Sequence, residues 1–148
     1  EIRCILEEVK FESSIYIMME TLKYLKKGGR VTPAAAAIAT VLRIRPVLQI
    51  QGEKLDAFAK ARSEKLGRGI MIDAMRKDID TRFGGTDQVR VFVAHTNNEA
   101  AARDFVQTIE QELGVEIVYC DPLSLSVSCH IGPGALAIAC SKKIDRFL

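Results

Sequence analysis

Residues 89–120 read VRVFVAHTNNEAAARDFVQTIEQELGVEIVYC, and this stretch predicts a strand, a helix and a second strand in succession. Its first part, residues 89–94, is apolar apart from Arg90 and predicts a central strand. The asparagine pair 97–98 predicts a helix N-terminus, because asparagine caps the free N–H groups of a first turn, and Gly114 predicts the C-terminus. Residues 115–120 predict the next strand. Strands joined by a helix are the repeating unit of α/β domains.

The residues before this stretch continue the pattern. Residues 63–83 predict a long helix that ends at Gly84-Gly85, and its apolar side is formed by Leu66, Ile70, Ile72, Met75 and Ile79. Residues 46–51 and 55–59 predict a β-hairpin around the polar turn 52–54.

The N-terminal part of the chain predicts shorter elements. Residues 2–9 have helical spacing, and residues 15–19 are a short apolar run that indicates a buried strand. A short helix over residues 21–27 is stopped by Gly28-Gly29. Thr32-Pro33 then predicts the start of an alanine-rich helix that ends before the next proline, Pro46.

Together these elements predict an α/β fold: a two-layer α/β domain with a mixed β-sheet and with helices mainly on one face. Residues 134–140 are a final apolar run, which periodicity alone leaves open as a strand or as the start of a helix.

Composition narrows the class of protein. The chain has 148 residues, of which 48% are hydrophobic and 27% charged, as in one soluble globular domain. A net charge of +2, with 6% aromatic residues, gives no support for a nucleic-acid partner. The uncharged residues 122–141 include prolines, glycines and serines, so they do not predict a membrane span. The cysteines lack metal-site spacing and are predicted to be free, buried thiols of a cytoplasmic protein: Cys4, Cys120, Cys129 and Cys140.

Two stretches are candidates for a binding site, since the sequence holds no strong catalytic or metal-binding motif. In residues 25–33, Arg30 follows two glycines and precedes a helix start, which suits a carboxylate or a phosphate. The alternative is a helix C-cap with solvated basic residues. In residues 128–135, His130 precedes Gly-Pro-Gly, a rigid turn that could present the imidazole to an anionic head group at a sheet edge. A turn histidine bonded to backbone is the equal alternative.

Other polar residues are weaker candidates. Lys60 and Arg62 form a basic patch just before the long helix, where a phosphate or an acidic partner could dock. Solvated surface is the simpler interpretation of these two cations. His95, at the end of a predicted strand, is expected to be structural and to anchor the start of the next helix.

Five ordered blocks of this sequence resemble the DegV family, over nearly the whole chain. The blocks are LKYLKKGGRVT (residues 22–32), IRPVL (44–48), GEKL with KAR (52–55 and 60–62), VAHT (93–96) and HIGPGA (130–135). DegV proteins are bacterial, cytosolic, two-domain proteins that bind fatty acids, and some are the lipid-binding subunit of a fatty acid kinase.

The resemblance implies a function and a set of residues. The chain is expected to be the C-terminal domain, with the family's N-terminal domain absent. It is expected to help hold a long-chain fatty acid and to present the carboxylate to an ATP-using kinase subunit, with no catalytic residue, metal or cofactor of its own. Arg30 and His130 match the family residues near the head group. Arg62, with Lys60, matches a position for phosphoryl transfer or kinase docking, although Ser63 stands where the family block has glycine.

Two competing hypotheses remain at this stage. One is a protein-interaction or regulatory domain that docks through Lys60 and Arg62. The other is a hydrolase that uses His130 with Ser126 or Ser128, for which the sequence specifies neither an acid partner nor an oxyanion loop.

Overall fold

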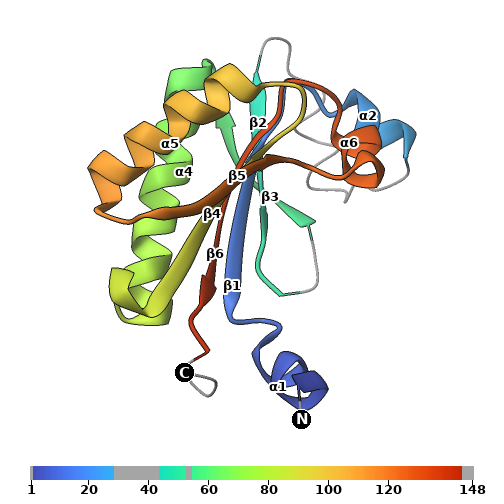
Figure 1. The fold of residues 1–148 in the computed structure, drawn as a ribbon. Helices are drawn as coiled ribbons and strands as arrows, with labels where there is room; N and C mark the ends of the chain where they lie inside the picture. The colour runs from blue at the N-terminus through green and yellow to red at the C-terminus, as the bar shows by residue number, and fades with distance from the viewer. Residues whose placement is uncertain (1, 29–43, 53–54, 145–148) are drawn as a thin grey trace.

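The computed structural model describes residues 2–28, 44–52 and 55–144, and in this range the fold is built around one mixed sheet (Figure 1). The sheet has six strands in the order β3-β2-β1-β6-β4-β5. Its strands are β1 (Ser13–Met18), β2 (Arg45–Ile50), β3 (Leu55–Ala61), β4 (Val89–His95), β5 (Ile117–Pro122) and β6 (Leu136–Lys142). The β4–β5 pair is parallel, and the other neighbours are antiparallel. The α/β class and the mixed sheet are therefore confirmed.

The two long helices cover one face of this sheet (Figure 1). They are α4 (Glu64–Asp78), which continues as a π-helical turn over Ile79–Phe83, and α5 (Glu99–Leu113). Alternate residues of β1, β4 and β6 point toward them and form the larger core, which includes Met18, Val93 and Ile138. This core contains Phe105 and Met75, each with no exposed surface.

The short helices α2 (Lys23–Lys27) and α6 (Leu125–Ile131) lie against each other at one end of the opposite face (Figure 1). Beneath them is a second apolar cluster, whose buried members are Ile17, Met19, Leu22, Leu25, Leu48, Ile131, Ala135 and Ala137. We call this the α2–α6 cluster. The helix α1 (Ile2–Val9) projects from the other end of the sheet and has no buried residue.

One end of the sheet gathers the elements that matter below. Met18, Leu136 and His95 lie side by side in the strand register, as do Arg45 and Ala61 on β2 and β3. The ends of β1, β3, β4 and β5 therefore meet there, together with α2 and α6. We call this the α6 end of the sheet.

Most predicted elements are confirmed. Ser63 caps α4 by accepting a hydrogen bond from the backbone N–H of Leu66 at 3.2 Å, and Gly114 ends α5 with φ of 65°. Residues 134–140, left open between strand and helix, contain most of β6. The helix expected from Thr32 lies outside the described residues.

Three expectations were wrong in detail. Asn98 is the N-cap of α5, but its side chain makes no capping bond because the amide donates instead to the carbonyl of Gly134 at 3.2 Å. The cysteines are free, yet Cys4 and Cys129 are exposed, since neither helix that carries them is buried. His130 was expected in a turn and instead occupies the last turn of α6, a serine-rich helix with one buried residue.

Candidate functional site

The imidazole of His130 packs against the C-terminal end of α2. A Cβ atom added to Gly28 would lie 2.6 Å from Nδ1 of His130 and 3.3 Å from Cε1, so only a glycine permits this approach. Gly28 is the C-cap of α2, and its N–H donates to the carbonyl of Tyr24 at 2.9 Å. The C-cap expected at the first of the two glycines is therefore confirmed.

Two further glycines bring α6 and the strand after it close to α2. A Cβ atom on Gly132 would overlap the ring of Tyr24, and one on Gly134 would lie 2.7 Å from Cγ of Glu20. Both glycines have positive φ, 79° and 83°, which disfavours any other residue. The Gly-Pro-Gly segment after α6 therefore packs closely against Glu20 and Tyr24, which follow β1 in the sequence.

His130 stands directly beside the apolar α2–α6 cluster. Its neighbour Ile131 is 4% exposed and packs in that cluster with Leu25 of α2. His130 itself is half-buried, and no residue of the described ranges makes a hydrogen bond to its imidazole. The alternative of a turn histidine bonded to backbone is therefore not found within these ranges.

Arg30, the second predicted head-group residue, lies outside the described residues. It follows Gly28 by two positions in the sequence. The structure therefore places His130 against Gly28, close in the sequence to Arg30.

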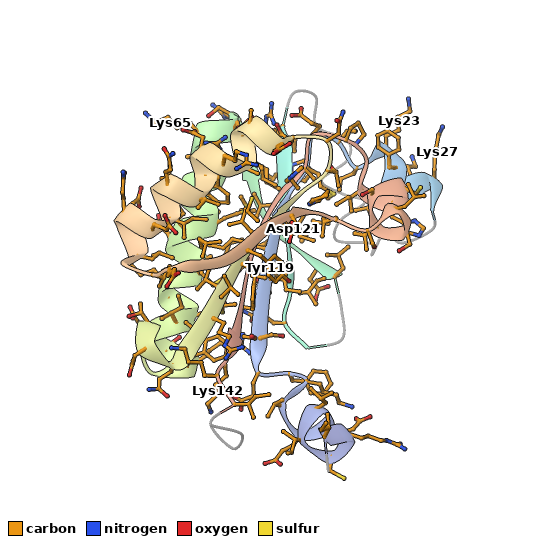
Figure 2. The ribbon with its side chains drawn as sticks, in the orientation of Figure 1. Lys23, Lys27, Lys65, Tyr119, Asp121 and Lys142 are labelled. Carbon is orange, nitrogen blue, oxygen red and sulfur yellow. The ribbon has the colours of Figure 1, made fainter. Side chains whose placement is uncertain are left out.

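Exposed cations gather at this end of the sheet. Lys60 and Arg62 lie at the end of β3 and just after it, and no acidic side chain within residues 2–28, 44–52 and 55–144 pairs with either. On α2, three lysines line a hollow of about 430 Å³ with Thr21 and Leu22: Lys23, Lys26 and Lys27. Figure 2 shows Lys23 and Lys27 projecting away from the body, and Lys65 at the same end of the molecule. This end therefore carries several exposed cations, in a chain whose net charge is +2.

The serines of α6 do not form a catalytic pair with His130. Ser128 donates its hydroxyl to the carbonyl of Leu123 at 3.1 Å, and the Ser126 hydroxyl lies 3.1 Å from that of Ser124. Neither hydroxyl contacts the imidazole, so the nucleophile–base hydrogen bond of a hydrolase is not formed among these residues.

His95 has the structural role expected for it. It is 6% exposed, and Nδ1 accepts a hydrogen bond from the backbone N–H of Asn98 at 3.2 Å. Its carbonyl accepts a hydrogen bond from the backbone N–H of Leu123 at 2.8 Å, which ties the end of β4 to the chain entering α6.

Sequence analysis did not identify Tyr24 and Thr96, which contact the Gly-Pro-Gly segment and hold it in place. The HIGPGA and VAHT blocks were the available signals, but they do not reveal that the two segments touch.

Two further observations on the described residues concern membranes and metal ions. No helix among them has both the length and the apolar character needed to cross a membrane. They also contain no group of three or more histidine, cysteine or acidic side chains placed to hold a metal ion.

Comparisons with known proteins extend this description. The model of the family described as "Uncharacterised protein, DegV family" matches residues 1–143. A DegV domain-containing protein from Clostridium acetobutylicum is 33% identical over 139 residues, which are 94% of this chain and 47% of that protein.

Two solved structures have the same fold. A stearic acid-binding protein from Eubacterium ventriosum superposes with a TM-score of 0.87 at 20% identity, over 95% of this chain and 48% of that one. DegV from Bacillus subtilis, described as a fatty acid binding protein, gives a TM-score of 0.75 at 27% identity, over 96% and 49%. The chain thus spans about half the length of the relatives it matches. Since the family model covers almost all of its residues, this chain belongs to the DegV family.

Proposed function

We propose that this chain is a fatty-acid-binding domain whose head-group site lies at the α6 end of the sheet. The observation that carries the proposal is the His130 imidazole, unbonded among the described residues and held between the Gly28 turn and an apolar cluster. The solved relatives from Eubacterium ventriosum and Bacillus subtilis, described as binding fatty acids, support the same ligand class.

In this proposal the acyl chain lies on the sheet face opposite α4 and α5. Partly buried apolar side chains continue the α2–α6 cluster across that face, and they include Ile15, Ile50, Leu55, Ala57 and Ala94. Each methylene that leaves water contributes about 0.8 kcal/mol, so a long chain gains most of its affinity there. The carboxylate then reaches His130, which donates a hydrogen bond, and Arg30, which supplies a charge.

We further propose that the longer protein is a carrier in the bacterial cytoplasm and that these residues are its C-terminal domain. An N-terminal domain would complete the site, because the relatives are about twice as long as this chain. An ATP-using fatty acid kinase subunit would dock at Lys60 and Arg62 and convert the carboxylate to an acyl phosphate. The two exposed cations suit an acidic protein surface or the transferred phosphate.

Lipid extraction tests the ligand class. The chain and a longer protein that includes it are purified from bacteria, and extracted lipids are identified by mass spectrometry. We expect stoichiometric long-chain fatty acid on the longer protein. An absence of fatty acid from both proteins would refute the proposal.

A matched pair of ligands tests the head-group site. The delipidated protein is titrated with stearic acid and with octadecanol, by displacement of a fluorescent fatty acid. His130→Ala is expected to weaken binding of the acid and not of the alcohol, and Ser126→Ala on the same helix is expected to change neither. Equal losses for acid and alcohol would show that His130 does not contact the carboxylate.

Charge reversal tests the docking surface. Lys60→Glu with Arg62→Glu is expected to reduce acyl phosphate formation with a kinase subunit and to leave fatty acid binding unchanged. Arg90→Glu with Lys143→Glu makes the same change in charge at the opposite end of the sheet. Equal activity of the two double variants would count against this surface.

A further inference from the structure

Thr96 is a buried polar residue just after β4 that the proposed binding site does not otherwise use. It is 3% exposed, and its hydroxyl both donates and accepts a hydrogen bond. Oγ1 donates to the carbonyl of Gly132 at 2.5 Å and accepts from the backbone N–H of Ala135 at 3.0 Å. One side chain therefore joins the two ends of the turn that follows His130 and Ile131.

The backbone of Thr96 holds the same turn. Its carbonyl accepts from the N–H of Gly134 at 2.7 Å, and its N–H donates to the carbonyl of Ala135 at 3.2 Å. The Asn98 side chain adds a fifth bond, to the carbonyl of Gly134 at 3.2 Å. These bonds connect the end of β4, which pairs with a strand on each side, to the segment between α6 and β6.

The held turn fixes where α6 ends. The N–H of Gly132 donates to the carbonyl of Ser128 at 2.8 Å, so the turn and the last turn of α6 are one continuous hydrogen-bonded unit. On its other side Gly132 abuts the Tyr24 ring, which leaves no room for the turn to approach α2 further. A shift of the turn would therefore move His130 relative to Gly28.

We propose that Thr96, assisted by the amide of Asn98, is the positioning residue for His130. By holding the Gly132–Ala135 turn, the threonine hydroxyl sets the imidazole against Gly28, where it meets the ligand's carboxylate. This inference rests on the proposed fatty-acid function for its consequence in binding, but the position of the imidazole can be measured without any ligand.

The test compares Thr96→Val, which keeps the shape and removes the hydroxyl, with Thr96→Ser, which keeps the hydroxyl. Histidine-selective NMR suits this chain because it has only two histidines, and His130→Ala assigns the signals. In the ligand-free wild type we expect a nuclear Overhauser effect between the Gly28 Hα and the His130 ring. T96V is expected to lose it and T96S to keep it.

Fatty acid affinity gives the second readout. T96V is expected to weaken stearic acid binding about as much as His130→Ala does, and the double variant is expected to be no weaker than H130A alone. Ser14→Ala is the matched control, because Ser14 is a fully buried hydroxyl in the same sheet, bonded to Arg82 at the opposite end. We expect S14A to retain full affinity and the Overhauser effect.

Several results would overturn the proposal. One is an unchanged Overhauser effect in T96V, and another is T96S behaving like T96V, since the hydroxyl would then be irrelevant. If T96V cannot be purified, Thr96→Ala, which also removes the hydroxyl, takes its place, and an unmoved His130 signal in T96A overturns the proposal equally. If the wild type binds no fatty acid, the fatty-acid function fails while the ligand-free Overhauser comparison still decides the role of Thr96.

Discussion

Gly28→Ala is the smallest change that separates the geometry of the site from the stability of the fold. Gly28 has φ of −79° and ψ of −1°, a conformation that alanine adopts without strain. The added methyl group nevertheless lies 2.6 Å from Nδ1 of His130. The whole effect of the substitution is therefore expected on the imidazole, and not on the backbone of α2.

The expected magnitude follows from that distance. The imidazole must retreat by roughly 0.8 Å, from 2.6 Å to at least the 3.4 Å of ordinary van der Waals contact. A hydrogen bond to a charged group contributes about 1.5–3 kcal/mol, and a displacement of this size removes most of it. Stearic acid should then bind about 10- to 100-fold more weakly. The free energy of unfolding should fall by only about 1 kcal/mol, because the half-buried ring can swing outward.

The assay is displacement of a fluorescent fatty acid, together with urea unfolding followed by circular dichroism. Gly69→Ala is the matched control, because a Cβ on this exposed glycine of α4 has no atom within 4 Å. It should raise the free energy of unfolding by about 0.5–1 kcal/mol and leave the affinity unchanged. If G28A binds stearic acid as tightly as the wild type does, His130 does not act from the position described.

Three further predictions concern the rest of the fold. Burial and the hydrogen bond to Asp78 raise the pKa of the Tyr16 hydroxyl. As the pH rises above about 10, the unfolded chain therefore loses this proton before the folded chain does, and the free energy of unfolding falls. In Tyr16→Phe, urea unfolding at pH 9 and pH 11 should show a smaller fall in that free energy. Burial raises the pKa of the Cys140 thiol to about 12, whereas Cys129 is exposed. After alkylation at pH 8, mass-spectrometric mapping should therefore find Cys129 modified well before Cys140. Equal labelling of the two cysteines would contradict this prediction. Ser63→Ala removes the N-cap of α4 and should cost about 1 kcal/mol in urea unfolding, with no loss of fatty acid affinity.

The elements that sequence analysis located well are those with strong local signals. Residues 89–94 were found because all of them except Arg90 are apolar, and α5 because Gly114 marks its end. The extent of the long helix was also predictable, since Ser63 caps it and two glycines follow it. In each case the information lies within the segment itself.

The site was less predictable because its geometry depends on contacts between distant segments. Residues 125–131 contain two serines, which favour helices weakly, and one buried residue, so no helical periodicity predicted α6. The contact between His130 and Gly28 joins residues about one hundred positions apart. Asn98 has the residue type of a cap, yet tertiary structure gives its amide another partner, the carbonyl of Gly134.

Mutations at the candidate site and mutations in the larger core should have different effects. Helices of five and seven residues, such as α2 and α6, are not stable alone, so contacts made at Gly28, Gly132 and Thr96 fix their positions. The larger core lies on the other face of the sheet, under α4 and α5, and shares none of these contacts. Substitutions at the contacts between α2 and α6 should therefore alter ligand affinity more than the free energy of unfolding. Substitutions in the larger core should alter the free energy of unfolding more than ligand affinity. A substitution such as Phe105→Ala, expected to cost about 3–5 kcal/mol of stability, should leave the affinity of the protein that remains folded unchanged.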